Sequence, residues 1–285
     1  MKGQRVMRFN KYLAAASTMA LALALTACGG GDEEEFDSIV AKAEETGKLT
    51  IGIKYDQPGL GLKEGDGFTG FDVEMAKIVA EGLGVEEGDI TFKEAVSANR
   101  ETFLEQGEVD LIFATYSITD ERKEVVSFGG PYFVAGQSLL VAADNNDITG
   151  PETLGGKKLC SVTGSTSAQR VKDEFAEDVQ LQEFDSYSKC VDALKGGQLD
   201  ALTTDDIILA GFAAQAPEEL KVVGETFSEE RYGVGMPKGD TETCEKVNEI
   251  LTESFEDGSW QEALEQSVGD SGYELPEPPT LDDCA

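Results

Sequence analysis

The sequence lacks histidine altogether, contains a single tryptophan and is poor in basic residues. Its 285 residues include 23 Lys and Arg against 56 Asp and Glu, which gives a net charge of −33. Such a surface repels nucleic acid and anionic lipid, so we exclude both as partners. Zinc sites and thioredoxin-like chemistry are poorly supported because there is no His and no C-x-x-C pair, and we expect no metal and no cofactor. An anionic ligand would need cations placed locally, so the few Lys and Arg residues are the most informative.

Long apolar runs are also absent, except at the N-terminus. There a basic segment (residues 2–11) precedes an apolar run (residues 13–25) that is too short to span a bilayer, which is typical of a secretory signal. Leu25-Thr26-Ala27-Cys28 resembles a bacterial lipobox and predicts a signal over residues 1–27 and a lipid on Cys28. The alternative is an ordinary signal with an incidental cysteine. Residues 28–36 form a flexible tether, so we expect an extracytoplasmic protein held at the outer face of the cell membrane only by its lipid.

Cysteines are few, and their number is even once Cys28 is set aside. In an oxidising compartment Cys160, Cys190, Cys244 and Cys284 allow three pairings. We prefer Cys160–Cys190 with Cys244–Cys284, since each pair then lies within one predicted half of the body. The sequence alone does not choose between the three.

The body of about 250 residues alternates short strands with amphipathic helices, which predicts an α/β fold of one large or two ordinary domains. The clearest helix covers residues 71–83, because its apolar side chains fall on one stripe. The other expected helices are residues 99–106, 166–176, 187–195 and 205–214. The expected strands are residues 48–53, 90–92, 109–114, 158–162, 179–184, 201–204 and 221–223.

Two segments repeat the pattern L-x-x-G-x-[VL]-D-[LA], at residues 104–111 and 194–201. In each, a helix ends on glycine and a buried strand starts after the aspartate. Five residues after that aspartate come Thr115 in the first copy and Asp205 in the second. Ligands of open α/β sheets bind beyond the carboxyl ends of strands, so two similar lobes would place these residues on opposite walls of a cleft. A chance likeness between common helix–strand units is the alternative.

Two further strands, residues 137–142 and 231–236, bracket the second copy and are expected to cross between the lobes. We therefore divide the body into lobe 1, residues 37–136 and 232–285, and lobe 2, residues 137–231. Two crossovers make a hinge, and hinge closure around a ligand is a common means of capture.

The helix at residues 71–83 also carries a longer motif, Gly70-Phe71-Asp72-Val73-Glu74-Met75 followed by Val79-Ala80 and Leu83. This motif resembles the signature of the family 3 bacterial extracellular solute-binding proteins, and every position of the signature is filled. The resemblance covers nearly the whole mature body, and within the family the chain most resembles the glutamate-binding lipoproteins of actinobacteria. The other matching segments are residues 117–122, 131–133, 164–166, 200–205 and 232–235.

The resemblance implies a type II, two-lobe, periplasmic-binding-protein-like fold with two hinge crossovers and the ligand in the interlobe cleft. It also implies a receptor that captures a polar amino acid and delivers it to the permease subunits of an ABC importer, and not an enzyme. We expect a monomer whose lobes close on the ligand, because only the closed form brings both walls into contact with it.

An α-amino acid needs a cation for its carboxylate and an acceptor for its ammonium group. The family uses the Arg of a T-x-x-R segment for the first task, which corresponds to Arg122, and an acid after the D-A strand for the second, which corresponds to Asp205. Further donors to the carboxylate are expected from Ser117 and from the turn Ser165-Thr166 at a helix N-terminus. The carbonyl oxygen of Thr115 is expected as a further acceptor for the ammonium group. The alternative for Arg122 is a surface ion pair with its acidic neighbours.

Two more cations favour an acidic side chain on the ligand. Receptors of this family for acidic amino acids carry a cation at the position of Lys54 and a second Arg at the position of Arg100, with Ser97 beside it. A buried carboxylate is costly unless it is paired, so these cations are best explained by glutamate or aspartate. The alternative is that Lys54 is solvated and that Arg100 caps its helix.

Relatives often carry a polar or cationic side chain at the position of Val162, so one contact from lobe 2 is missing unless Ser186 or Tyr187 replaces it. Three rival functions remain open. A receptor for glutamine, asparagine or another polar amino acid would not need the charge of Lys54. A dehydratase on this fold would need an acid–base pair, yet the chain has no His, no nucleophile elbow and no phosphate loop. A signalling receptor would need a membrane span, and no later stretch is long and apolar enough.

Overall fold

The computed structural model describes residues 36–165, 167–174 and 178–284. The predicted signal segment and Cys28 lie outside the described residues, as does Thr166. Within these ranges, no helix combines the length and the apolar character needed to cross a membrane. Contacts group the chain from Phe36 onward into one structural unit.

Strands and helices alternate along this unit, and each expected element lies within two residues of its predicted bounds. The strands are β1 (Leu49–Ile53), β2 (Asp56–Gln57), β3 (Gly61–Glu64), β4 (Gly67–Thr69), β5 (Ile90–Glu94), β6 (Leu111–Phe113), β7 (Val126–Ala135), β8 (Gln137–Ala142), β9 (Lys158–Val162), β10 (Gln180–Phe184), β11 (Ala201–Asp205), β12 (Leu220–Val223) and β13 (Glu230–Pro237). The helices are α1 (Ile39–Thr46), α2 (Phe71–Gly82), α3 (Arg100–Glu105), α4 (Asp120–Lys123), α5 (Ser167–Glu174), α6 (Tyr187–Lys195), α7 (Asp206–Gln215), α8 (Thr241–Asp257) and α9 (Ser259–Val268).

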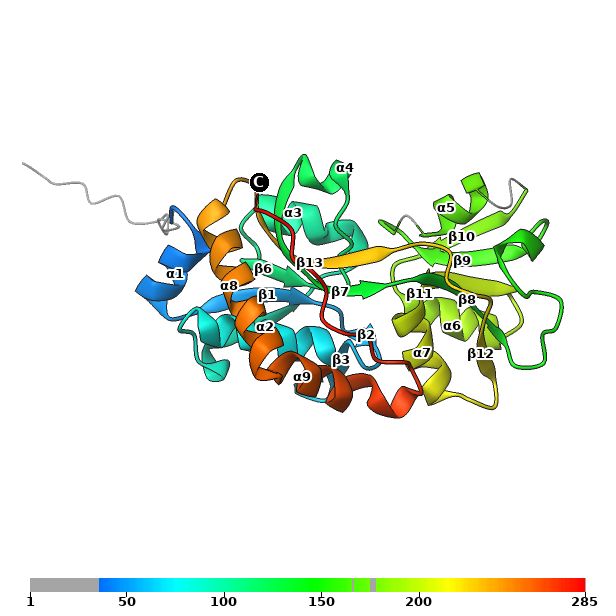
Figure 1. Ribbon diagram of the computed structural model, residues 1–285. Helices are drawn as coiled ribbons and strands as arrows, with labels where there is room; N and C mark the ends of the chain where they lie inside the picture. Colours follow the sequence, from blue (N-terminus) through cyan, green and yellow to red (C-terminus); the bar gives the residue numbers. More distant parts are fainter. Residues whose placement is uncertain (1–35, 166, 175–177, 285) are drawn as a thin grey trace, which may run out of the picture. The chain divides into compact units, whose positions relative to one another are not determined.

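The first large sheet has the strand order β5-β1-β6-β13-β7 (Figure 1). Its core strand β1 pairs in parallel with β5 and β6, whereas β13 and β7 run antiparallel to each other. Helices α2 and α8 pack on one face and α3 on the other. The pleat explains this double cover: Leu111 and Phe113 join the core under α2, and Ile112 joins the separate core under α3.

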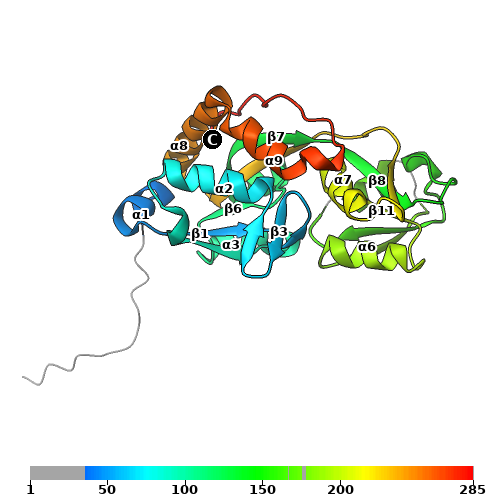
Figure 2. The same ribbon diagram turned by 90° about the horizontal axis from the view of Figure 1, so that it is seen from below.

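The second large sheet has the order β10-β9-β11-β8-β12, with α6 and α7 on one face and α5 on the other. Side chains alternate here too: Leu140 and Leu202 face the core shared with α6 and α7, while Leu139 and Ala201 face the core under α5. A small sheet of β2, β3 and β4 precedes α2. Figure 2 shows α2 and α9 beside the first sheet and α6 and α7 beside the second.

Two antiparallel strands connect the sheets. Strands β7 and β8 are separated only by Gly136, so the chain passes directly from the first sheet into the second. It returns through β13, which pairs with β7 from Glu230 opposite Ala135 to Pro237 opposite Val126. The return strand begins at Glu230, slightly earlier than predicted. This is the two-lobe α/β architecture with two crossovers that the sequence predicts.

The repeated L-x-x-G-x-[VL]-D-[LA] segments occupy equivalent places in the two sheets. Gly107 and Gly197 both adopt a left-handed backbone, with φ of 66° and 68°. The carboxylates of Asp110 and Asp200 each accept the backbone N–H at the start of the neighbouring parallel strand, at 2.7 Å in both copies. The repeat therefore forms the same local structure in both sheets. A helix ends, and the aspartate that follows fixes the register of the next strand, β6 in the first copy and β11 in the second.

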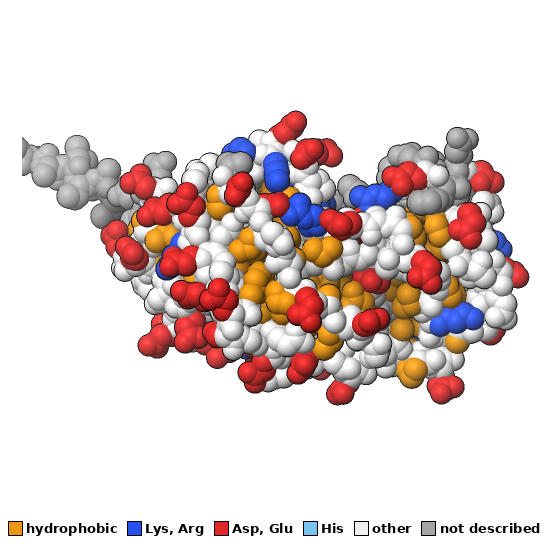
Figure 3. All heavy atoms as spheres, viewed as in Figure 1, with side chains coloured by type: hydrophobic (Ala, Val, Ile, Leu, Met, Phe, Trp, Pro, Cys, Tyr) orange, Lys and Arg blue, Asp and Glu red, His pale blue; other side chains and the backbone are white. Residues whose placement is uncertain are grey.

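Both disulfides of the preferred pairing are present. Cys160–Cys190 joins β9 to α6, and Cys244–Cys284 ties α8 to the C-terminal segment. Helices α8 and α9 were not among the predicted elements, although Asp240 caps the first of them by accepting from the Thr243 N–H at 3.0 Å. Figure 3 shows acidic side chains spread over the visible face, with only a few Lys and Arg side chains among them.

Candidate functional site

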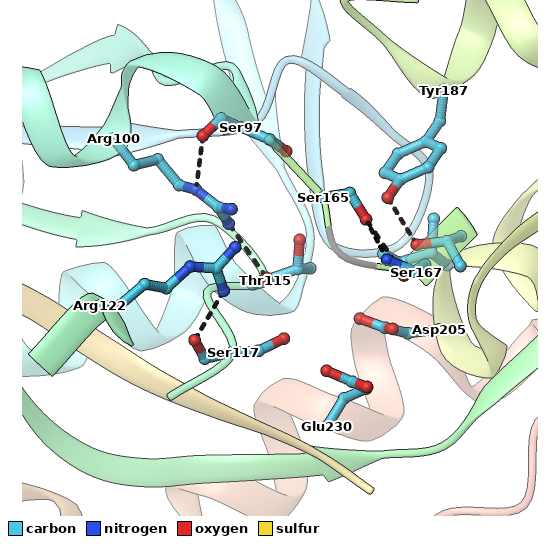
Figure 4. Close-up of a pocket in the computed structure, with 12 residues that line it drawn as sticks. Ser97, Arg100, Thr115, Ser117, Arg122, Ser165, Ser167, Tyr187, Asp205 and Glu230 are labelled. Carbon is cyan, nitrogen blue, oxygen red and sulfur yellow. Dashed lines mark hydrogen bonds between the residues drawn. The ribbon is translucent and has the colours of Figure 1, made fainter. Parts of the chain in front are cut away.

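A small pocket lies where strand ends of the two large sheets meet. It opens beyond the carboxyl ends of β6 and β11, as expected for α/β sheets. The lining residues are Ser97, Arg100, Thr115, Ser117, Arg122, Ser165, Ser167, Tyr187, Thr204, Asp205, Ile208 and Glu230 (Figure 4).

Most of the predicted site residues are brought together here. Thr115 and Asp205, the two strand-end residues of the repeat, both line the pocket. Ser97, Arg100, Ser117, Arg122 and Ser165 line it as well.

Arg122 reaches from the first sheet's side of the pocket to the second. Its Nη1 donates to the Ser117 carbonyl at 2.7 Å, and its Nη2 donates to the Gly164 carbonyl at 3.1 Å. Its Nε lies 3.4 Å from a carboxylate oxygen of Glu101. The guanidinium is 9% exposed, so the alternative of a solvated surface ion pair does not describe this side chain. Each terminal nitrogen keeps one further N–H for a ligand.

Arg100 lies beside Arg122 and is more deeply buried, at 3% exposure. Its Nε donates to the Ser97 carbonyl, and Nη1 donates to the carbonyls of Ala114 and Thr115 at 3.1 and 3.3 Å. Burial and the neighbouring Arg122 lower the pKa of Arg100 to about 10, so it stays charged at neutral pH. Nη2 bonds none of the described residues and is available to an acceptor in the pocket.

The ring of Tyr116 lies beneath both arginines. The guanidinium carbon of Arg100 is 4.2 Å from the ring centroid, and that of Arg122 is 5.0 Å from it. An aromatic face attracts cations, so it offsets part of the repulsion between two neighbouring positive groups. The Tyr116 hydroxyl in turn donates to Glu101 at 2.8 Å.

Lys54 does not line the pocket itself. Its Nζ donates to Ser97 Oγ at 2.7 Å, and Ser97 is the residue that reaches the pocket. Burial first, and Arg100 second, hold the pKa of Lys54 well below its ordinary value. The direct contact of Lys54 with a ligand stays a prediction; here one of its N–H groups bonds Ser97, which does line the pocket. The alternative of a solvated Lys54 is also wrong, since this side chain is buried.

Thr115 holds a backbone conformation that is rare for a side chain of its type, with φ of 46°. A buried aspartate of the signature motif stabilises it: Asp72 Oδ2 accepts the Thr115 N–H at 2.9 Å. The other oxygen of Asp72 accepts from the Tyr132 hydroxyl at 2.7 Å. Burial raises the pKa of Asp72 to about 6. In the sequence Asp72 stands out only as part of a motif, whereas in the structure it supports Thr115 of the pocket wall.

The opposite wall is acidic. Asp205 accepts from the Tyr232 hydroxyl at 2.6 Å, and burial together with the nearby Glu230 raises its pKa. Glu230 forms an ion pair with Arg170 and accepts from the Ser228 hydroxyl at 2.9 Å. Figure 4 shows the two acids facing the two arginines across the pocket. This layout suits a zwitterion that presents carboxylate to one wall and ammonium to the other.

Several lining residues were not predicted. They are Ser167, Thr204, Ile208 and Glu230. Tyr187, one of the two candidates for the contact that Val162 does not supply, lines the pocket, and its hydroxyl accepts from Thr204 at 2.7 Å. Ser186, the other candidate, does not line the pocket. An acid at the start of a crossover strand was the one signal that would have identified Glu230. Among the described residues, no cluster of His, Cys, Asp or Glu fits a metal ion.

The model of the bacterial extracellular solute-binding proteins, family 3, matches residues 49–270, and the chain belongs to this family. Glutamate-binding protein GluB of Corynebacterium efficiens is 46% identical over 281 residues, 94% of each chain. ABC transporter glutamine-binding protein GlnH of Bacillus subtilis is 36% identical over 265 residues, 90% of this chain and 96% of the other. The solved structure of an ancestral arginine-binding protein bound to glutamine has a TM-score of 0.73 at 38% identity, over 78% of this chain and 98% of the other. The family consists of solute-binding proteins, so the chain is a binding protein and not an enzyme.

Proposed function

We propose that this chain is the extracellular, lipid-anchored receptor of an ABC importer and that its ligand is an acidic L-amino acid, glutamate or aspartate. The observation that carries the ligand class is the pair of buried arginines in one pocket of a strongly acidic protein. Two buried cations side by side are costly unless anionic groups join them. Glu101 lies only beside Nε of Arg122, and none of the described acids forms an ion pair with Arg100. An α-carboxylate at the free N–H groups of Arg122 therefore leaves Arg100 to pair with a second carboxylate.

The proposed contacts divide the ligand into three parts. Arg122, with Ser117 and Ser165, holds the α-carboxylate through paired N–H and O–H donors. Asp205 accepts from the α-ammonium group, and Glu230 adds negative charge on the same wall. The side-chain carboxylate takes the free Nη2 of Arg100.

Ser97 completes the side-chain subsite because Lys54 donates to its hydroxyl oxygen. A hydroxyl that already accepts from an ammonium group directs its own hydrogen elsewhere, here into the pocket. A donor at this point favours a carboxylate oxygen over the NH₂ of an amide. Lys54 therefore supports acidic specificity through Ser97.

Capture follows from the two-lobe fold. We propose that lobe 1 (residues 37–136 and 232–285) and lobe 2 (residues 137–231) close about the strands β7 and β13, because only the closed form offers both walls to the ligand. The closed form then docks on the permease of the importer as a monomer, and the lipid on Cys28 keeps the receptor at the membrane. The GluB and GlnH names of the relatives support an amino-acid ligand and an importer as partner.

The first test is calorimetric titration of the body that follows Cys28 with L-glutamate, L-aspartate, L-glutamine and L-asparagine. We expect one-to-one binding that is tighter for the acids. Arg100→Gln removes the direct partner of the side-chain carboxylate and should weaken glutamate binding by about 100-fold or more. Lys54→Gln should weaken it by about tenfold, since it acts through one hydrogen bond to Ser97.

Lys63→Gln is the matched control, because this lysine lies on β3 outside the lining of the pocket and should leave affinity unchanged. Preference for glutamine would keep the class of receptor and discard the acidic ligand, an outcome that the GlnH name makes the second candidate. No binding of any of the four by folded protein would overturn the amino-acid proposal.

A further inference from the structure

Asp56 makes a contact between segments that are 132 residues apart and belong to different sheets. Its Oδ2 accepts the backbone N–H of Ser188 at 3.0 Å and the Ser188 hydroxyl at 3.1 Å. Asp56 lies in β2, directly after the end of β1, whereas Ser188 is the second residue of α6, beside the second large sheet. Neither residue lines the pocket.

The contact supplies a helix cap that α6 does not provide for itself. Ser186 stands at the N-cap position but makes no side-chain capping bond. The first N–H groups of a helix have no partner within the helix, and a carboxylate at this end is favoured by the helix dipole as well. Asp56 therefore caps α6 from the other side of the pocket.

Helix α6 also carries part of the pocket wall. Its first residue, Tyr187, lines the pocket and is bonded to Thr204. One turn further on, Cys190 is bonded to Cys160 of β9, which fixes the helix to its own sheet. Any displacement of the first turn of α6 therefore moves Tyr187, and the second sheet moves with it as a rigid body.

The segment after Asp56 adds a second close approach to the same side. A Cβ on Gly211 of α7 would lie only 2.2 Å from the carbonyl oxygen of Pro58, so only glycine permits this packing. Residues 56–58 are consequently seated against both α6 and α7.

We propose that Asp56 is a positioning residue for ligand retention: it caps α6 across the pocket and so holds Tyr187 and the second wall closed over the bound amino acid. The contact requires the two sheets to be together, so it favours the closed form and is lost on opening. Asp56 never touches the ligand. This proposal rests on the proposed function, because ligand retention is measured with the amino acid as the bound probe.

The test is a double-mutant cycle on L-glutamate binding, with association and dissociation rates measured by stopped flow. Asp56→Ala should weaken affinity about tenfold, mostly through faster dissociation, and Ser188→Ala about threefold. The double variant should be no weaker than Asp56→Ala alone, since both changes remove one contact. The cycle is needed because the charge of Asp56 also raises the pKa of Lys54, an effect that Ser188→Ala leaves intact.

Asp185→Asn is the matched control. Asp185 lies next to the same helix end, but its carboxylate bonds Lys189 of the same helix and is exposed, so affinity should stay within twofold of wild type. Equal losses for Asp185→Asn and Asp56→Ala, or additive losses in the cycle, would overturn the proposal.

Hydrogen exchange of the Ser188 amide, measured with and without saturating L-glutamate, separates this idea from the proposed function. Because the contact exists only in the closed form, the amide should exchange about tenfold faster in saturated Asp56→Ala than in saturated Asp185→Asn. If wild type binds no amino acid, the proposed function fails, and faster exchange in ligand-free Asp56→Ala than in ligand-free Asp185→Asn still supports the contact. Equal exchange of the two variants at saturation, or in the absence of any binding, refutes the contact.

Discussion

Two arginines are buried side by side in this protein, and each uses its donors in a different way. Arg100 spends three of its N–H bonds on carbonyls of the first sheet's side, so its position is set before a ligand arrives. Arg122 divides its bonds between Ser117 and Gly164, which come from different sides of the pocket. In the proposed binding mode, the first would be a fixed element of the side-chain subsite, and the second would link ligand binding to the approach of the two walls.

Asp72 shows how a residue outside the pocket shapes it. The N–H of Thr115 would have no partner in its left-handed conformation without the Asp72 carboxylate. The signature motif of the family thus holds a strained strand end in the place where a ligand is expected. Its cost is a buried carboxyl group whose pKa is raised to about 6.

The buried carboxyl group of Asp72 makes the free energy of unfolding depend on pH. The folded pKa of Asp72 lies above its ordinary value of 3.8, so its contribution is full below about pH 4 and is lost as pH rises through 6. The free energy of unfolding of wild type, relative to Asp72→Asn, should fall by about 2 kcal/mol from pH 4 to pH 7. Urea unfolding of both proteins at several pH values measures this. A difference that is constant, or that grows with pH, would contradict the buried, partly protonated carboxyl group.

At the scale of elements, the C-terminal segment is held to the first sheet by several independent contacts. The N–H of Asp282 donates to the Gly130 carbonyl at 2.7 Å, and its carboxylate pairs with Arg231 of β13. The disulfide Cys244–Cys284 closes this arrangement onto α8. The segment thus binds β7 and β13, the two strands about which the lobes are proposed to move.

Removal of that disulfide should lower stability without changing the pocket. Cysteines 40 residues apart close a loop whose loss typically costs about 2–4 kcal/mol, so Cys244→Ala/Cys284→Ala should unfold at lower urea concentration. Neither cysteine lines the pocket, and affinity for L-glutamate should be preserved. Reduction of the Cys244→Ala/Cys284→Ala protein serves as the control for the remaining Cys160–Cys190 bond, and reduction of wild type should lower the midpoint to that of the reduced variant. Equal midpoints for the oxidised and the double-variant protein would show that the bond does not limit unfolding.

For the whole molecule, two sheets connected by β7 and β13 meet around a pocket whose cations and anions lie on facing walls. Only the approach of the walls brings Arg122 to Gly164, Asp56 to Ser188 and Pro58 to Gly211. A ligand that contacts both walls adds its own free energy to these contacts, so it shifts the population toward the closed form.

This mechanism predicts compaction on binding. X-ray scattering should show a smaller radius of gyration when L-glutamate is added at saturation. Gly211→Ala places a methyl group against the Pro58 carbonyl and should oppose closure, with affinity at least tenfold weaker and less compaction. Gly269→Ala is the control, since its Cβ would meet no atom within 4 Å. Saturated wild-type protein that keeps its ligand-free radius would refute hinge closure.

The sequence by itself determined the α/β class, the order of the strands and helices that it predicts, and most of the pocket, whereas it left three disulfide pairings open. These depend on local patterns: apolar spacing sets each helix and strand, and a polar residue just after a buried strand is placed at the sheet edge wherever that strand pairs. Thr115 and Asp205 were predictable in this way, and Arg100, Ser117 and Arg122 were predictable from the family motif.

Only the tertiary structure decided which of these groups line the pocket. Lys54 does not line it and is buried against Ser97, 43 positions away. Tyr187, Glu230 and the Asp56–Ser188 contact depend on how elements of different sheets come together. The local sequence pattern does not encode these contacts between sheets. They are set by the packing of whole sheets and by the hydrogen bonds that buried polar groups must form at the contact.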